Sequence, residues 1–182
     1  WIVDPLDGTK EFGSRGRPDW AVQIALAVAG ELRLGVVTLP ASGVTLQSGS
    51  PGRYAPRPPG PLRMAVSRTR CPQVAVELAR ALGAELVPIG SVGAKVAAVI
   101  FGDADLYVHD GGQYQWDSAA PVAVARAAGL VATRLDGSAL RYGGADPYLP
   151  DLLVGTPEAV QAARRELVAL PASRRVLADA AA

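Results

Sequence analysis

Residues 1–12 read WIVDPLDGTKEF. Three apolar residues lead directly into Asp4, and a second acid, Asp7, follows three positions later. Pro5 fixes its own φ angle and restricts the preceding residue to an extended conformation, while Asp7-Gly8 is typical of a turn in which the glycine adopts a positive φ. The stretch therefore predicts a buried strand that holds two carboxylates in a rigid arrangement at its C-terminal end.

Two carboxylates held this close together require a positive charge between them. Like charges at short range raise each other's pKa unless a cation compensates them. A divalent metal with oxygen ligands meets this requirement, and the backbone carbonyl of Leu6 can add a further ligand. Asp-Pro and Asp-Gly are also common turn formers without any metal, so the stretch by itself leaves both interpretations open.

The composition is that of a globular protein without an obvious polymeric partner. The chain has 182 residues, of which 49% are hydrophobic and 19% are charged. A net charge of +1 gives no electrostatic basis for binding nucleic acid or a membrane surface, and no apolar run approaches the ~18 residues of a transmembrane helix. Cys71 is the only cysteine, which excludes a disulfide framework and favours a cytoplasmic location.

The pattern of apolar residues divides the chain into two parts. Trp1 to Val3 already reads as the middle of a strand, so we expect a longer protein of which this is a piece. The stretch PGRYAPRPPGP (51–61) cannot continue a helix or a sheet, and we place a domain boundary there, between residues 1–61 and 62–182. In the first part, strands are predicted at 1–3, 20–28, 32–37 and 44–47. In the second part, strands at 62–66, 85–89, 105–108, 130–133 and 152–154 alternate with helices over 74–82, 92–100, 118–128 and from Pro157 onward. This alternation indicates a layered α/β domain.

A second group of polar residues lies in HDGGQYQWDSAAP, residues 109–121. Asp117 precedes the predicted helix, so it is either an N-cap or a third carboxylate for the same metal cluster, and the two roles are compatible. Trp116 would then pack beside the site. His109 is interpreted as a strand-end or surface residue rather than a ligand, because Mg²⁺ prefers oxygen.

The stretch GSVGAK, residues 90–95, leads into another predicted helix. Free backbone N–H groups at a helix N-terminus, small residues and a cation together suit a phosphate. The spacing is not that of a P-loop. The alternative interpretation is that Gly90 only ends a strand and that Lys95 lies on a solvated helix face.

Together these segments resemble one family. WIVDPLDGT resembles the Asp-Pro-(Ile/Leu)-Asp-Gly-Thr signature of the inositol monophosphatase-like phosphatases, which are metal-dependent and lithium-sensitive, and QWDSAAPVAVARAAG resembles their second signature, Trp-Asp-x-Ala-Ala. Both occur in the expected order. Within that superfamily, DPLDGTKEF, GSVGAK and GGQYQWDSAAP are most similar to the CysQ type of 3'(2'),5'-bisphosphate nucleotidase. The resemblance extends from residue 1 to about residue 155.

The resemblance implies a fold, a metal site and a set of roles. The fold would be a layered α-β-α-β-α sandwich, with its first domain incomplete in this chain, and the cofactor would be two or three Mg²⁺ ions. The metal ligands would be Asp4, Leu6, Asp7 and Asp117. The catalytic set would be Asp4, Asp7 and Thr9, and the substrate-binding set Gly8, Thr9, Lys10, Gly90, Ser91 and Lys95.

The implied activity is Mg²⁺-dependent removal of the 3'-phosphate of adenosine 3',5'-bisphosphate, a product of sulfate activation. The alternative substrates are inositol monophosphate and fructose 1,6-bisphosphate, because the signatures contact only phosphate and metal. A non-catalytic module that binds metal or nucleotide is the alternative class. The family also has a Glu-Glu pair upstream of the first signature that this sequence lacks, so we expect the chain alone to miss one metal ligand. A homodimer is implied by similar enzymes.

Overall fold

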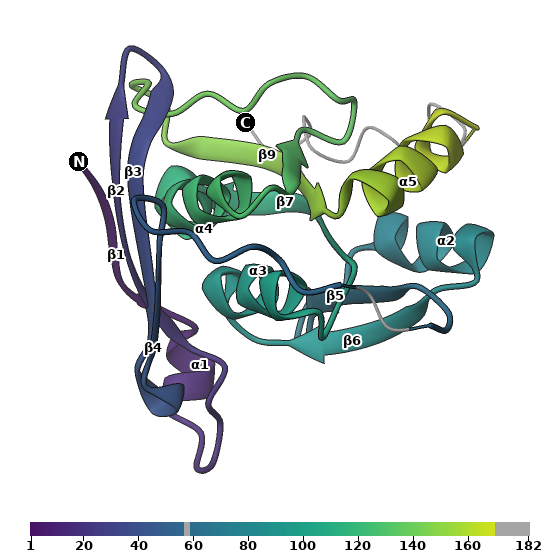
Figure 1. Ribbon diagram of the computed structural model, residues 1–182, viewed down its shortest axis with the longest axis horizontal. Coiled ribbons are helices and arrows are strands. Elements are labelled where there is room, and N and C mark those ends of the chain that lie inside the picture. Colours follow the sequence, from purple (N-terminus) through teal and green to yellow (C-terminus); the bar gives the residue numbers. More distant parts are fainter. Residues whose placement is uncertain (57–58, 170–182) are drawn as a thin grey trace.

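The computed structural model describes residues 1–56 and 59–169. In these residues sheets and helices form alternating layers, in the order sheet, helices, sheet, helices (Figure 1). The first sheet has the strand order β1-β2-β3-β4 and the second the order β6-β5-β7-β9-β8. Helices α3 and α4 lie between the sheets, and α2 and α5 cover the other face of the second sheet. The mixed α/β class is confirmed, and these layers match four of the five that the resemblance implied.

The elements lie close to their predicted positions. The first sheet contains β1 (Ile2–Asp7), β2 (Ala21–Val28), β3 (Glu31–Leu39) and β4 (Val44–Gln47), with α1 (Thr9–Phe12) after β1. The second contains β5 (Arg63–Ser67), β6 (Glu85–Ile89), β7 (Leu106–Tyr114), β8 (Val131–Thr133) and β9 (Tyr148–Gly155). The remaining helices are α2 (Gln73–Leu82), α3 (Val92–Phe101), α4 (Gln115–Ala127) and α5 (Pro157–Ala169). Several predicted bounds were too narrow: β1 continues through the proline to Asp7, β3 extends to Leu39, β7 extends to Tyr114, α4 begins at Gln115 and β9 begins at Tyr148.

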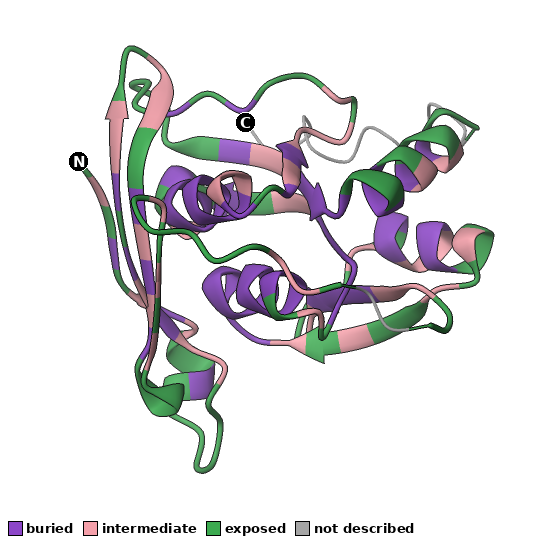
Figure 2. Ribbon diagram, in the orientation of Figure 1, coloured by how far each residue is buried: buried purple, intermediate pink, exposed green. Residues whose placement is uncertain are grey.

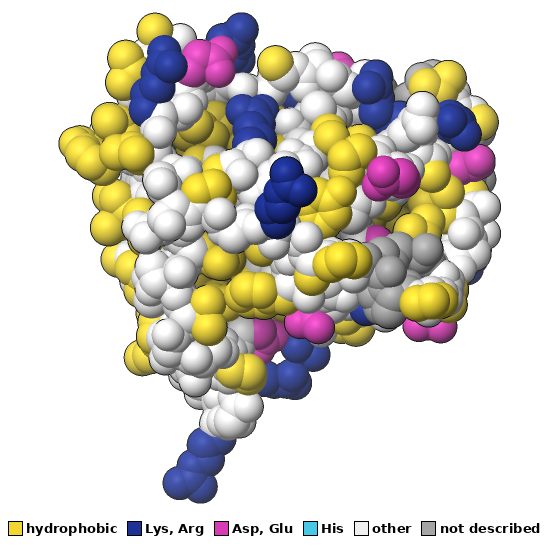
Figure 3. Space-filling model, viewed as in Figure 1, with side chains coloured by type: hydrophobic (Ala, Val, Ile, Leu, Met, Phe, Trp, Pro, Cys, Tyr) yellow, Lys and Arg dark blue, Asp and Glu magenta, His cyan; other side chains and the backbone are white. Residues whose placement is uncertain are grey.

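Small side chains let the first sheet approach the middle helices closely. Along β2 the buried positions alternate, and Ala21 and Ala25 both face inward with no exposed surface. On β3, Gly35 lies so near α4 that an added Cβ would be 2.5 Å from the Cβ of Ala123. The opposite face of this sheet is partly exposed at Ile24, and hydrophobic side chains line the margin of the molecule where β1 and β2 lie (Figure 3).

The middle helical layer forms most of the larger core. In α3 every residue from Val92 to Ile100 is buried, and most of α4 is buried as well (Figure 2). Because both sheets pack on these helices, one hydrophobic cluster joins residues on either side of residue 61, such as Val37 and Leu152. None of the helices in the described ranges has the length and apolar character needed to span a bilayer.

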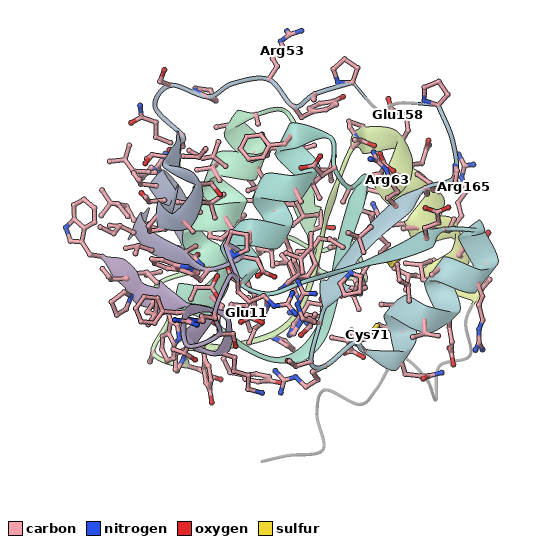
Figure 4. The ribbon with its side chains drawn as sticks, turned by 90° about the horizontal axis from the view of Figure 1, so that it is seen from below. Glu11, Arg53, Arg63, Cys71, Glu158 and Arg165 are labelled. Carbon is pink, nitrogen blue, oxygen red and sulfur yellow. The ribbon has the colours of Figure 1, made fainter. Side chains whose placement is uncertain are left out.

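The proline-rich connection follows the surface of the molecule. Its residues 51–56 have no regular secondary structure, as predicted, and Arg53 projects away from the body of the protein (Figure 4). Two hydrogen bonds nevertheless attach it to the middle layer, from Tyr54 N to the carbonyl of Ala128 (3.3 Å) and from Ala55 N to the carbonyl of Ile100 (2.8 Å). The domain boundary at residue 61 stays a prediction.

Candidate active site

A one-residue slip in strand pairing brings the two acids of β1 to the same face. Residues three apart on a regular strand point to opposite faces. Here Asp4 pairs with Gln23 and Asp7 pairs with Ala21, so β1 uses three steps where β2 uses two. This bulge turns both carboxylates inward, where both are buried. The N–H of Leu6 donates to Asp4 Oδ1 (3.0 Å) and holds that carboxylate in place.

Asp117 completes a three-carboxylate cluster from a distant part of the sequence. One carboxylate oxygen from each of Asp4, Asp7 and Asp117 lies within 4.8 Å of the others. The prediction that Asp117 precedes the helix was wrong, because α4 starts two residues earlier and places it in the first turn. Its carboxylate still satisfies the helix end, since Oδ2 accepts from the N–H of Tyr114 (2.7 Å). Capping and membership of the cluster are therefore compatible.

The N-terminus of α3 binds Asp7 directly. Asp7 Oδ2 accepts hydrogen bonds from the Ser91 hydroxyl (2.7 Å) and from the N–H of Gly93 (2.9 Å), and a third from the side-chain amide of Gln23. The Ser91 hydroxyl in turn accepts from the N–H of Ala94 (3.0 Å). The N–H of Gly93 is therefore occupied by Asp7 and that of Ala94 by the Ser91 hydroxyl, so neither of these two groups is free for a phosphate, contrary to the expectation for the helix N-terminus.

Burial raises the pKa of all three acids. Desolvation is the largest cause in each case, and it raises the pKa of Asp7 to about 6 against the lowering effects of its hydrogen bonds and of Lys95. Removing a carboxylate from water disfavours its charged form, and neighbouring acids add to the effect. A divalent cation with oxygen ligands would reverse this shift. The described cluster therefore has the ligand type, the spacing and the unbalanced charge that suit a metal ion.

Lys95 lies inside the same site. The alternative that it lies on a solvated face is wrong, since the side chain is buried, donates to the carbonyl of Gly90 and lies 5.3 Å from the centre of the Tyr107 ring. Burial lowers the pKa of Lys95 to about 8, although Asp7 and other nearby acids oppose the change. The ammonium group is thus held beside the carboxylates as a partial counter-charge.

Two of the three carboxylates, those of Asp7 and Asp117, open onto a cavity of about 150 Å³. Asp7, Asp117 and Gly8 line it together with Lys95. Gly8 has the predicted positive φ, 87°, which starts α1. Thr9 and Lys10 follow in α1 and are exposed, and Gly90 and Ser91 also line the cavity. Of the residues predicted for the site, Asp7, Gly8, Gly90, Ser91, Lys95 and Asp117 thus line the cavity, whereas Asp4, Leu6, Thr9 and Lys10 do not.

The interpretation of His109 as a strand-end or surface residue was wrong. It is buried in β7 and lines the cavity, and its Nε2 has no hydrogen-bond partner among the described residues. Desolvation, with a contribution from Lys95, lowers the pKa of His109 to about 4. The ring is therefore neutral at pH 7. Arg70, which was not predicted, also lines this wall and donates to the carbonyl of Gly112 (3.2 Å).

Three further polar residues support the site and were not predicted. Glu11 is buried on α1 and lines the cavity, and it lies inside the molecule in Figure 4. Asp19 accepts from the N–H of Gly90 (2.6 Å) and from Arg68 (2.6 Å), which links two loops around the site. Gln23 carried a usable signal, because an inward-facing amide within an apolar strand needs a polar partner.

The fold is a layered α/β fold, and beside its cavity lies a cluster of three carboxylates of the kind that holds a metal ion. The model of the inositol monophosphatase family matches residues 1–174, and the chain belongs to this family. It is 51% identical over 162 residues to the 3'-phosphoadenosine 5'-phosphate phosphatase of Mycobacterium bovis, covering 85% of this chain and 61% of that protein. It is 35% identical over 161 residues to the 3'(2'),5'-bisphosphate nucleotidase CysQ of Escherichia coli, covering 82% of this chain and 64% of that protein.

Solved structures agree with this assignment. The crystal structure of CysQ from Bacteroides thetaiotaomicron matches with a TM-score of 0.75 and 28% identity, over 86% of this chain and 69% of that chain. The chain spans about 61% of the length of the mycobacterial relative named above.

Proposed function

We propose that the protein is a divalent-metal-dependent phosphomonoesterase that removes the 3'-phosphate of adenosine 3',5'-bisphosphate. The observation that carries this proposal is the cluster of Asp4, Asp7 and Asp117, with carboxylate oxygens within 4.8 Å of one another beside the Gly8-Thr9 turn. The names of the mycobacterial and enterobacterial relatives support the nucleotide as substrate.

The carboxylates would hold the metal. Asp4, Asp7 and Asp117 offer hard oxygen ligands, and the carbonyl of Leu6 would add another. When bound, a divalent ion such as Mg²⁺ neutralises phosphate charge and lowers the pKa of a water molecule. We propose two or three Mg²⁺ ions, as the resemblance implies. Since Asp7 Oδ2 is occupied by three donors, its other oxygen is the one left for a ligand.

The remaining side chains would orient the phosphate and limit its repulsion. Gly8 and Thr9 begin α1 next to the cluster, and we propose that their N–H groups hold the scissile phosphate while the Thr9 hydroxyl orients the attacking water. Lys95 is held by the Gly90 carbonyl inside the cavity, where its charge reduces the repulsion between the acids and a phosphate. Lys10, Gly90 and Ser91 complete the proposed substrate-binding set.

Inositol monophosphate and fructose 1,6-bisphosphate remain the alternative substrates. We also propose that the protein is cytoplasmic and forms a homodimer. The experiment is phosphate release from the full-length protein with adenosine 3',5'-bisphosphate, inositol 1-phosphate and fructose 1,6-bisphosphate, in Mg²⁺ and in EDTA. We expect release from the nucleotide, only with Mg²⁺. Activity that persists in EDTA, or no release from any of the three, would refute the proposal.

Substitutions sharpen this test. Asp4→Ala and Asp7→Ala should abolish turnover and weaken Mn²⁺ binding measured by electron paramagnetic resonance, whereas Asp136→Ala, in an exposed turn, should change neither. Thr9→Ala should lower kcat more than it raises KM. A pure KM effect would contradict the role of Thr9 in orienting water.

A further inference from the structure

Three aromatic side chains form an exposed cluster beside the cavity. The rings of Tyr114 and Trp116 are stacked, with centroids 4.7 Å apart and planes at 15°, and Tyr148 contacts Tyr114 edge-on at 6.2 Å. Their exposed fractions are 43%, 39% and 37% respectively. Three neighbouring aromatic side chains that each leave more than a third of their surface exposed form an apolar surface of the kind that receives a ligand. We refer to Tyr114, Trp116 and Tyr148 as the aromatic shelf.

The shelf is connected to the three-carboxylate cluster through neighbouring residues of the chain and through hydrogen bonds. Tyr114 and Trp116 are close neighbours of Asp117 in sequence, and the N–H of Tyr114 donates to the Asp117 carboxylate (2.7 Å). The hydroxyl of Tyr148 accepts from the N–H of Gly112 (3.3 Å), and Gly112 lines the cavity. The shelf therefore adjoins the cavity and does not belong to a separate face.

Backbone contacts hold the three rings in position. Tyr114 at the end of β7 is the register partner of Tyr148 at the start of β9 (Figure 1), so two rings arise from one cross-strand pair. The N–H of Gln115 donates to the carbonyl of Pro147 (2.7 Å), which ties the start of α4 to the same strand. A ligand would thus meet a preformed surface and would not have to order it.

The size of the cavity leaves part of a nucleotide outside it. A volume of about 150 Å³ is small compared with the roughly 300–1,000 Å³ of pockets that enclose a whole drug-sized ligand. The carboxylates and Lys95 account for the phosphate and its metals. The nucleoside must therefore lie at the mouth of the cavity, where the shelf offers aromatic faces.

We propose that the aromatic shelf binds the purine base of the substrate by stacking. This inference rests on the proposed function. It goes further, because it distinguishes a nucleotide from the other substrate classes. Base-aromatic stacking contributes about 1–3 kcal/mol per base and tolerates any base, because every base has a π-face. A polyhydroxylated ring such as inositol has no such face. The shelf therefore favours a nucleotide over an inositol phosphate and discriminates weakly between adenine and guanine.

The first test is kinetic and uses the full-length protein. Tyr114→Leu combined with Tyr148→Leu should raise KM for adenosine 3',5'-bisphosphate about tenfold, the equivalent of about 1.4 kcal/mol of stacking, with little change in kcat. KM for ribose 3,5-bisphosphate, which lacks the base, should not change. Phe101→Leu removes an exposed aromatic ring at the end of α3 and is the matched control. An unchanged KM for the nucleotide, or an equal rise for the abasic substrate, would overturn the inference.

The second test does not depend on turnover. Trp1→Phe combined with Trp20→Phe leaves Trp116 as the single tryptophan of residues 1–182, and with any tryptophan of the full-length protein outside these residues also replaced by Phe, the fluorescence reports on the shelf alone. AMP and GMP should both quench this emission, whereas ribose 5-phosphate should not. Quenching in a protein that releases no phosphate would refute the proposed function and support the shelf. Phosphate release without quenching would support the function and overturn the shelf.

Discussion

Protonation of His109 should destabilise the fold in acid, and His109→Gln should remove that effect. Burial lowers the pKa of His109 from 6.5 to about 4 in the folded protein, whereas the unfolded chain keeps the ordinary value. Above pH 6.5 the ring is neutral in both states and costs nothing. Between pH 6.5 and pH 4 the unfolded state binds a proton that the folded state excludes, so stability falls as the pH falls. A shift of about 2.5 pH units corresponds to about 3 kcal/mol.

The comparison between wild type and variant isolates this residue from other titrating groups. The raised pKa of Asp7, about 6, acts in the opposite direction, because the folded state then binds the extra proton between pH 6 and pH 3.8. Both proteins share this contribution, and it cancels in the difference.

Urea unfolding in EDTA, followed by circular dichroism at pH 7, 6, 5 and 4, measures the quantity directly. Wild type should lose about 3 kcal/mol more than His109→Gln between pH 7 and pH 4. Parallel pH profiles would refute the argument, because they would mean that the imidazole titrates normally and is not held neutral in the cavity wall.

Two further predictions concern contacts that stabilise the fold away from the cavity. Gly35→Ala should destabilise the protein by about 1–3 kcal/mol in urea unfolding, because the new Cβ would lie 2.8 Å from a carbonyl oxygen of α4, whereas Gly49→Ala has nothing within 4 Å and should be within about 0.5 kcal/mol of wild type. Equal effects would contradict the close approach. Arg63→Met should cost about 2 kcal/mol in the same assay, because it removes the ion pair to the buried Asp105, while Arg141→Met in an exposed pair should cost at most about 1 kcal/mol. The reverse order would contradict the burial argument.

The elements of the fold were largely predictable because each has a local cause. The helix α2 repeats apolar residues every four positions and ends at Gly83, which adopts a left-handed φ of 61°. The hairpin of β2 and β3 followed from alternating residues around Gly30. The start of α4 was missed, because Gln115 and Trp116 have no N-cap residue before them. Tyr114 takes that place, and its N–H is satisfied by Asp117 three residues later.

The site was predictable from local sequence where its residues follow one another, and its distant members Asp117, Gly90, Ser91 and Lys95 were indicated through the family resemblance. The sequence alone predicted that Asp4, Asp7 and Gly8 lie together in one short segment, because proline fixes its own φ and glycine permits the positive φ of the turn. Tertiary structure decided that β1 bulges so that both acids face the same side, and that Lys95 and His109 are buried beside them. Burial and strand register depend on what packs against a residue from far along the chain, and local sequence does not encode that environment.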